Sequence, residues 1–514
     1  MSDNTPDDEQ DPHEIVRRAL VRNVITEPLY GNIRKKPDDL VRVIIDVNLE
    51  YHEGREKAFQ RVKDLAEAAL SAKGQTGRND IQRPESVGSS ANPFMAAVLP
   101  GSIVQDMVRL DAEWARRDAP SQPAGVAPKP EAPPARPYTA IYRIWENFAV
   151  RPLIDRSVMT VKADAARRAF LAEGKDIIWA VIDSGVDGSH EHFKDARTLD
   201  LKLPVKHFDF TIPNGEGAPS ALMDGFGHGT HVAGIIAGGV LTARNFKLQA
   251  VRSRRDPQQD TVVPEIEPLD TIVGMAPFCQ IVSMKVLDNQ GQGDVARIIA
   301  ALDAVQRIND NGRQMLIHGV NLSLGYEFDP RWFACGQSPI CGEVNRLVRS
   351  GVVVVAAAGN TGYGTLSAKQ RSTGAGFMLT INDPGNAEYA ITVGSTHRDK
   401  PHIFGVSYFS SKGPTGDGRA KPDLLAPGER ILSCQSSATS PNAPTNCYVE
   451  DTGTSMAAPH VSGVIAAFLS IRREYIGRPE DVKQVFLSSA TDLKRERAFQ
   501  GFGLVDLMRA IQSV

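Results

Sequence analysis

The sequence predicts an α/β fold: a doubly wound, mostly parallel sheet with helices on both faces, preceded by a small α+β region. Two observations predict it. From about residue 175, continuous apolar, β-branched runs of strand length alternate with helical spacings, which is typical of a parallel sheet covered on both faces. Residues 31–150 instead follow the order β, α, loop, β, α, β, which favours a small split βαβ (ferredoxin-like) domain.

The bulk composition is ordinary for a globular protein, with 41% apolar and 23% charged residues in a chain of 514. The formal net charge of −3 gives no electrostatic case for nucleic acid or an anionic membrane, so we expect neither as a partner. Residues 1–30 are acidic and expected to be disordered. No secretory signal and no apolar run of membrane-spanning length is evident, which predicts a cytoplasmic location.

The cysteines predict neither a disulfide scaffold nor a zinc site. There are five, an odd number, and no two of them form a CxxC pair. Cys335 and Cys341 could close a small loop in an oxidising compartment, but two reduced thiols are the favoured interpretation.

The small N-terminal region contains three expected strands and two expected helices. The strand candidates alternate apolar and polar residues or are short apolar runs, whereas the helix candidates place apolar residues three or four positions apart. In chain order they are VRVIIDVN (41–48), EKAFQRVKDLAEAAL (56–70), FMAAVLP (94–100), SIVQDMVRLDAEW (102–114) and AIYRIWENF (140–148). A further short strand is expected within 71–92, and the seven prolines of 119–137 indicate an extended linker or exposed loop.

The larger region contains the strands and helices of the predicted parallel sheet. The strand candidates are DIIWAVID (176–183), CQIVSMKVL (279–287), VNLSL (320–324) and VVVVAAAGN (352–360), and two of the helices are RIIAALDAVQRI (297–308) and MAAPHVSGVIAAFL (456–469). Ligands of open α/β sheets bind at the carboxyl ends of the strands. Asp183, Ser323 and Asn360 stand at three such ends, and His228 lies in a Gly-rich turn that opens an apolar helix.

Ser455 lies where a loop of small residues, DTGT, becomes an apolar helix. A helix N-terminus has free N–H groups and favours negative charge, which suits a nucleophile whose partner becomes an oxyanion. A lone serine at this place is more often a helix cap. The choice therefore depends on whether the rest of the chain supplies a base, a group that orients it and an oxyanion donor.

Those groups are present, and together they favour catalysis over four separate structural roles. Serine needs a neighbouring base to attack a carbonyl, histidine titrates nearest neutrality, and a buried aspartate fixes the imidazole tautomer. An asparagine amide can donate to an oxyanion. The alternative is that the same region binds a metal ion, with ligands from His190, His192, Asp224, His228 and His231. The HExxH pattern of zinc peptidases is absent, which disfavours this alternative.

Eight stretches in order resemble the subtilisin-like serine peptidases, the subtilase family of S8 type. They are VIDSGVDGSH (181–190), GHGTHVAGIIAG (227–238), VNLSLG (320–325), AAAGN (356–360), GNAEYAITVGST (385–396), FSSKGP (409–414), KPDLLAPG (421–428) and GTSMAAPHVSGVIAA (453–467). The resemblance covers about residues 175–510 and implies a subtilisin-like catalytic domain over 151–514, with a polypeptide as substrate.

The resemblance assigns roles to particular residues. Asp183 would orient the imidazole, His228 would be the general base and acid, and Ser455 the nucleophile that forms the acyl-enzyme. The side chain of Asn360 and the backbone N–H of Ser455 would form the oxyanion hole. Substrate-binding residues would come from two backbone edges and one pocket wall: Gly291, Gln292, Gly293, Ser323, Leu324, Gly325, Ala356, Ala357, Ala358 and Gly359.

Residues 31–150 resemble the subtilisin propeptide of I9 type in layout and in the phrase AVLPG. This implies a zymogen whose own N-terminal domain folds and inhibits the peptidase, with a processing site within about 147–157. A permanent accessory domain is the alternative, and a catalytically silent peptide-binding or regulatory module is the alternative for the whole chain.

The chain departs from the family pattern in three insertions: 240–270, 326–341 and 361–384. The first is longer and more charged than the calcium-binding loop of secreted members and shows no clear ligand spacing. No cofactor is expected for the chemistry, and a structural calcium ion is an alternative that the sequence does not support. The other two insertions flank the expected cleft, either as ordinary surface loops or as lids, selectivity loops or partner sites.

Overall fold

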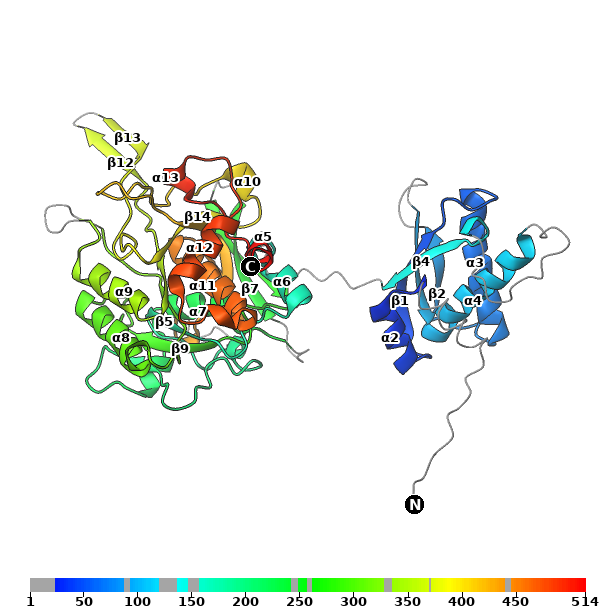
Figure 1. Cartoon of the computed structure of the whole chain (residues 1–514), viewed down its shortest axis with the longest axis horizontal. Coiled ribbons are helices and arrows are strands. Elements are labelled where there is room, and N and C mark those ends of the chain that lie inside the picture. Colours follow the sequence, from blue (N-terminus) through cyan, green and yellow to red (C-terminus); the bar gives the residue numbers. More distant parts are fainter. Residues whose placement is uncertain are drawn as a thin grey trace, which may run out of the picture. The chain divides into compact units, whose positions relative to one another are not determined.

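A computed structural model describes residues 24–86, 93–119, 136–146, 157–241, 248–256, 261–327, 335–368, 371–439 and 445–514. The chain divides into two compact units, Met1–Val150 and Arg151–Val514 (Figure 1). The first 23 residues, most of the proline-rich segment and nearly all of the expected processing segment lie outside the described residues.

The smaller unit is an antiparallel sheet in the order β2-β3-β1-β4 with helices packed on one face. Alternate residues of β1 and β3 point into this core, because successive side chains of a strand face opposite ways. The three expected strands and two helices are present, and β2 is the short strand expected within 71–92. The elements are α2 (Glu27–Lys35), β1 (Leu40–Val47), α3 (Arg55–Ala72), β2 (Gln82–Ser86), β3 (Phe94–Pro100), α4 (Gly101–Asp118) and β4 (Ile141–Glu146).

Helix α2 corrects the expectation of disorder through residue 30. Ile25, Leu29 and Ile33 recur at intervals of four, and their side chains are fully buried in the core of the smaller unit. This spacing is the apolar stripe of a helix, which the acidic composition of the preceding residues obscured.

The larger unit contains a seven-stranded sheet in which every neighbouring pair is parallel. Its strands, in spatial order, are β15 (Leu424–Glu429), β14 (Ile391–His397), β11 (Val353–Ala357), β10 (Gly319–Leu322), β5 (Ile178–Asp183), β9 (Gln280–Lys285) and β6 (Phe208–Asp209). The order reverses direction along the sheet, so the sheet is doubly wound. The predicted fold class is confirmed.

Helices cover both faces of this sheet (Figure 1). α8 (Val295–Ile308) and α9 (Pro339–Arg349) bury their apolar stripes in one core, and α7 (His228–Ile236) and α11 (Thr454–Ile471) pack in the other. The remaining helices are α5 (Ser157–Thr160), α6 (Ala163–Phe170), α10 (Pro401–Phe404), α12 (Pro479–Ser489), α13 (Arg497–Gln500) and α14 (Leu507–Gln512).

Helix α11 is apolar on all sides because it is a core helix. By length and composition it meets the criterion for a membrane-spanning segment, which the sequence analysis did not expect anywhere in the chain. In the fold, 83% of this helix, Thr454–Ile471, is buried. Its hydrophobicity is therefore accounted for by packing between the sheet and the helices α7 and α14.

Two insertions form β-hairpins. The first consists of β7 (Leu248–Asp256) and β8 (Thr261–Leu269), which extend a second sheet in the order β16-β17-β7-β8 through β17 (Cys447–Asp451) and β16 (Ile431–Cys434). Its charges form cross-strand pairs, Arg252 with Glu267 and Arg254 with Glu265. The second hairpin, β12 (Tyr363–Ala368) and β13 (Arg371–Gly376), projects from the body of the unit (Figure 1).

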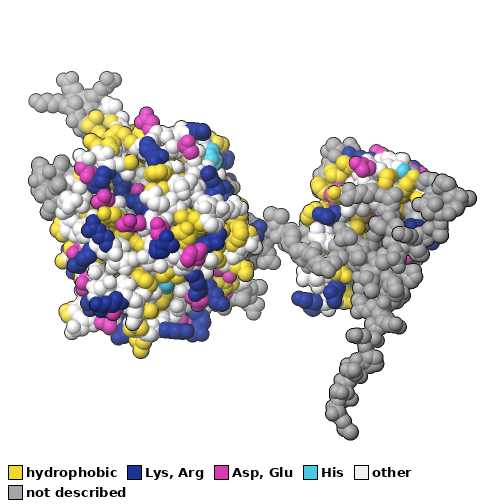
Figure 2. All heavy atoms as spheres, viewed as in Figure 1, with side chains coloured by type: hydrophobic (Ala, Val, Ile, Leu, Met, Phe, Trp, Pro, Cys, Tyr) yellow, Lys and Arg dark blue, Asp and Glu magenta, His cyan; other side chains and the backbone are white. Residues whose placement is uncertain are grey.

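Charges of both signs are interspersed over the visible face of the larger unit (Figure 2). This distribution agrees with the small net charge of the chain. It gives that face no continuous field of one sign for steering a polyanion.

We predict that Phe468→Ala, in the last turn of α11, lowers the free energy of unfolding by about 3–5 kcal/mol. The ring is fully buried and packs edge-on against Phe486 and Tyr475 at centroid distances of 5.4 and 5.3 Å. Urea unfolding of the full chain, in a Ser455→Ala background that excludes self-digestion, measures the change. Ile403→Ala at an exposed position should change it by less than about 0.5 kcal/mol, and equal effects of the two substitutions would contradict the prediction.

Candidate active site

The site is built around a buried carboxylate at the carboxyl end of β5. Asp183 is completely buried, and its Oδ1 accepts a hydrogen bond of 2.7 Å from Nδ1 of His228. The same oxygen accepts the Ser184 backbone N–H at 2.8 Å. A carboxylate can only accept, so Nδ1 carries the proton and the lone pair of the neutral imidazole is on Nε2.

The carboxylate also stabilises the protonated imidazole. Burial alone would lower the pKa of His228, but the negative charge of Asp183 and its hydrogen bond, assisted by Asp451 and Asp224, raise it to about 9. The His228 side chain is 17% exposed. The ring therefore reaches the cleft while its inner nitrogen stays on the buried carboxylate.

Asp224 fixes the start of the helix that carries His228. Its carboxylate accepts the backbone N–H groups of Gly227 and Thr230 and the hydroxyl of Thr230, at 2.6–2.8 Å. These N–H groups would otherwise lack partners at the helix start. In the part of the chain that the structure describes, no cluster of three or more His, Cys, Asp or Glu could hold a metal ion, and Asp224 has this capping task instead.

Lys285 is a buried cation that links the two loops. Its Nζ donates to the carbonyls of Ser184 and Met223 and to Oδ1 of Asn289, at 2.9, 2.9 and 3.1 Å. It thereby ties the turn after Asp183 to the segment before His228. Sequence reasoning missed Lys285, because a lysine at a strand end is ordinarily a solvated charge.

Ser455 lies in the first turn of α11 and lines the same cleft as His228. Its hydroxyl donates to the backbone carbonyl of Ser323 at 2.9 Å. Among the hydrogen bonds of the described residues, none joins Ser455 to His228. The structure therefore brings the two side chains to one cleft, with the hydroxyl turned towards the end of β10.

Asn360 follows β11 and lines the same cleft. Its Oδ1 accepts the backbone N–H of Thr454 at 2.9 Å and the Thr454 hydroxyl at 3.0 Å. Since the carbonyl end of the amide is held by α11, the NH₂ end is free to face the cleft. Thr454 is a further residue of the site, and its position next to Ser455 was the only signal for it.

The cleft has a volume of about 750 Å³ and two backbone edges. Its lining includes both segments that the resemblance implied as substrate-binding edges, Gly291–Gly293 and Ser323–Gly325. The Phe226 ring stands at the first edge, where a Cβ on Gly291 would come within 2.7 Å of it. Among the described residues, those that line the cleft are Phe226, His228, Leu287, Gly291, Gln292, Gly293, Asp294, Val295, Ile298, Ser323, Leu324, Gly325, Tyr326, Glu327, Ala357, Gly359, Asn360, Thr361, Asn382, Thr454 and Ser455.

The expected wall Ala356–Gly359 needs a correction. Ala357 and Gly359 line the cleft, whereas Ala356 and Ala358 are fully buried outside it. Successive residues of a strand face opposite sides, so Ala356 points into the core formed with α8 and α9. The backbone of Ala358 is bonded to Val393 and Asn382.

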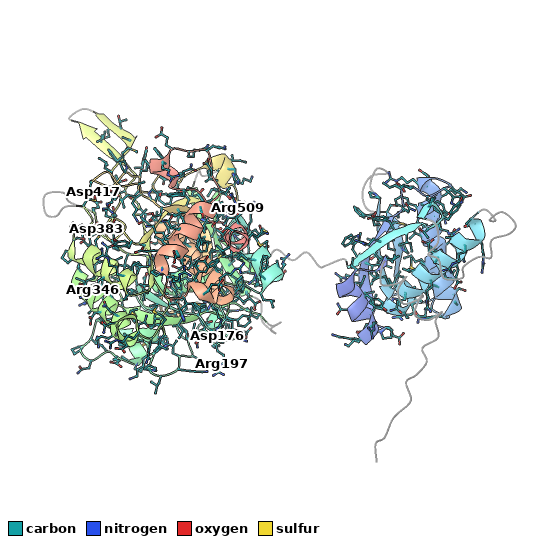
Figure 3. The ribbon with its side chains drawn as sticks, viewed as in Figure 1. Asp176, Arg197, Arg346, Asp383, Asp417 and Arg509 are labelled. Carbon is teal, nitrogen blue, oxygen red and sulfur yellow. The ribbon has the colours of Figure 1, made fainter. Side chains whose placement is uncertain are left out.

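The insertions 326–341 and 361–384 both contribute residues to the cleft. The sequence analysis had left open whether they are ordinary surface loops or part of the site. Tyr326 and Glu327 line it, and the backbone of Tyr326 pairs with Asp383 through two hydrogen bonds of 3.0 Å. Asp383 is buried and marked in Figure 3 on the larger unit. The adjacent Asn382 also reaches the cleft, so its floor is more polar than the apolar pocket that alanines alone suggested.

All five cysteines are free thiols buried in the larger unit. The favoured interpretation of Cys335 and Cys341 as reduced agrees with this state. Burial raises the pKa of the Cys341 thiol to about 12, which disfavours the reactive thiolate.

Comparison with known proteins supplies the class. The family model described as "Subtilase family" matches residues 174–504. The serine protease AprX of Bacillus subtilis (strain 168) is 28% identical over 367 residues, which cover 68% of this chain and 70% of the relative. Subtilisin DY of Bacillus licheniformis is 28% identical over 352 residues, which cover 68% of this chain and 96% of the relative. Pyrolysin of Pyrococcus furiosus is 32% identical over 345 residues, which cover 58% of this chain and 22% of the relative.

A parallel α/β sheet with a histidine on a buried aspartate and a serine at a helix start defines a class of serine hydrolase. The family match is more specific: this chain belongs to the subtilase family and is a subtilisin-like serine endopeptidase. Enzymes of this family need no cofactor for the chemistry.

We predict that the His228 imidazole titrates above the value near 6.5 of free histidine. Asp451→Asn should lower its pKa, because Asp451 stabilises the protonated ring through its charge. Histidine ¹⁵N NMR of the full chain with Ser455→Ala gives the titration. Asp176→Asn, on the surface beside Arg473 (Figure 3), should leave it unchanged, and a wild-type pKa at or below 6.5 would contradict the electrostatics of the site.

Proposed function

We propose that the chain hydrolyses peptide bonds through an Asp183–His228–Ser455 triad and an acyl-enzyme, with Asn360 as the oxyanion donor. The observation that carries the proposal is that His228, Asn360 and Ser455 line one cleft and that the buried Asp183 is hydrogen-bonded to His228, although the four residues come from four separate segments. Each residue alone has an ordinary structural role. Their joint placement provides a base, its orienting group, a nucleophile and an oxyanion donor.

In this mechanism the Ser455 hydroxyl leaves the Ser323 carbonyl and turns towards Nε2 of His228. Neutral His228 takes the hydroxyl proton as Oγ attacks the substrate carbonyl, and Asp183 stabilises the imidazolium. The imidazolium then protonates the leaving amine, and water hydrolyses the acyl-enzyme by the same route. Because only the neutral ring can accept the proton, kcat/KM should rise with pH through the His228 pKa.

The developing oxyanion would be held by Nδ2 of Asn360 and the N–H of Ser455. Thr454 supports this role, since its two hydrogen bonds engage Oδ1 and leave the amide's donor end, Nδ2, for another acceptor. The start of α11 adds a favourable partial positive charge. Donors that are fixed before the reaction need no reorganisation when the charge appears.

A polypeptide in extended conformation would lie between the edges Gly291–Gly293 and Ser323–Gly325. Backbone hydrogen bonds to such edges give affinity without sequence preference, and side-chain pockets give selectivity. Ala357, Gly359 and Asn382 would form the pocket wall and floor.

We also propose that the smaller unit is an inhibitory prodomain. Its support is the sheet face opposite the helices, where Ile44 and Val98 are half-buried and Trp145 is exposed. Cross-strand register places Trp145 beside Ile44. This face also carries Arg42, Asp46 and Arg143, and a mixed face with partly exposed aliphatic and aromatic side chains is suited to docking on another protein surface.

The rival function is a catalytically silent module that binds peptides in the same cleft. The intact set Asp183, His228, Asn360 and Ser455 favours the enzyme. The hydrogen bond from the Ser455 hydroxyl to the Ser323 carbonyl does not distinguish the two functions, because a silent module could also form it.

We predict that a fluorophosphonate probe labels wild-type enzyme on Ser455 and that Ser455→Ala takes no label. Only a serine activated by a neighbouring base attacks such a probe at a useful rate. Peptide mapping by mass spectrometry locates the label, and Ser513→Ala at the exposed C-terminus is the matched control that should label normally. A folded wild type that turns over no peptide and takes no label would support the silent module.

We predict that purified wild type is cleaved within about residues 147–157 and that Ser455→Ala remains one chain of 514 residues. The reason is that self-processing needs the same nucleophile as substrate hydrolysis. Intact-mass spectrometry of both preparations decides it. An active wild type that stays uncleaved would make the smaller unit a permanent domain.

A further inference from the structure

A chain of buried hydrogen bonds connects the core of α11 to the backbone of Ser455. The hydroxyl of Ser462 donates to Oδ1 of Asn321, and Nδ2 of Asn321 donates to Oγ of Ser323, each at 2.8 Å. The Ser323 hydroxyl then donates to the backbone carbonyl of Ser455 at 2.8 Å. Ser462 and Asn321 are completely buried and do not line the cleft.

The last acceptor in this chain needs a donor because of Pro459. In a regular α-helix the Ser455 carbonyl would accept the N–H of residue 459. Proline has no N–H, and its ring also crowds that carbonyl. The Ser323 hydroxyl therefore supplies the hydrogen bond that Pro459 cannot.

Asn321 is a polar residue in an otherwise apolar layer. Its neighbours in register on β5 and β11 are the buried valines Val181 and Val355. A buried amide is costly unless both of its ends are paired, and a valine would bury well at the same place. The amide is paired at both ends only because Ser462 and Ser323 flank it.

We propose that Ser462 and Asn321 are positioning residues that hold the nucleophile's backbone through Ser323. This inference rests on Ser455 being the nucleophile. A serine hydroxyl has one proton, and Ser323 gives it to the Ser455 carbonyl because Asn321 presents Nδ2 to the hydroxyl as a donor; Oδ1 in that place would compete for the same proton. Ser462 selects that amide orientation by donating to Oδ1. Without Ser462 the amide can rotate, its Oδ1 can take the Ser323 proton, and the Ser455 carbonyl loses its donor.

The test is the kinetics of Ser462→Ala in the full chain with a chromogenic peptide. We expect kcat to fall about tenfold with KM changed less than about twofold, since sub-ångström displacement of a nucleophile costs rate more than binding. The rate of labelling by the fluorophosphonate should fall by the same factor. Ser470→Ala is the matched control: it removes another hydroxyl from α11, one that donates to Ala467 and accepts the Gly174 N–H. It should leave kcat and the labelling rate unchanged.

A double-mutant cycle separates positioning from a general loss of stability. If Ser462 acts through Ser323, introducing Ser462→Ala into the Ser323→Ala variant should cause no further decrease in kcat. Multiplicative effects, or a wild-type kcat in Ser462→Ala, would overturn the proposal. Ser462→Cys keeps a weak hydrogen-bond donor and should give a kcat between those of the wild type and Ser462→Ala. If both Ser462 variants fail to fold, the residue serves folding rather than positioning, and the proposal is overturned.

The outcome is distinguishable from failure of the proposed function. A wild type without turnover or label removes the nucleophile itself. An active, labelled wild type whose Ser462 variants behave identically to it removes only the positioning role.

Discussion

The site depends on one constraint, which is that the carboxylate of Asp183 is buried with few partners. Its Oδ1 holds the His228 ring and the Ser184 N–H, whereas Oδ2 has no hydrogen-bond partner among the described residues. A buried negative charge of this kind is costly unless a positive charge can form beside it. The raised pKa of His228 expresses that balance. Asp224 and Lys285 then hold the two backbone segments so that the pair cannot separate.

The second half of the site is organised by the start of α11 rather than by a charge. Thr454 orients the Asn360 amide, and Ser323 engages Ser455 through both its hydroxyl and its carbonyl. Pro459 makes this engagement necessary by removing one helical hydrogen bond. The nucleophile is therefore held by neutral hydrogen bonds to the ends of β10 and β11, while the base is held electrostatically at the end of β5.

Much of this arrangement could be predicted from the sequence because it depends on local pattern. Continuous β-branched runs identified the parallel strands, and Asp183, Ser323 and Asn360 stood at the carboxyl ends of these runs. The alternation of strand residues was harder to apply to AAAGN, where the strand ends within the alanines, and so Ala356 and Ala358 were misassigned to the cleft. Helix α2 was missed because a composition argument for the acidic N-terminus was extended past Ile25.

The sequence by itself determined the fold class, the order of the catalytic candidates and the family, since these reside in short contiguous motifs. Tertiary structure decided what long-range contacts control: that 248–269 completes a sheet beside the strand leading to Ser455, that a buried lysine joins two loops, and that Ser462 reaches Ser455 through Asn321. Residues 321 and 462 have no local relation. Only the packing of α11 against β10 brings their side chains within hydrogen-bonding distance.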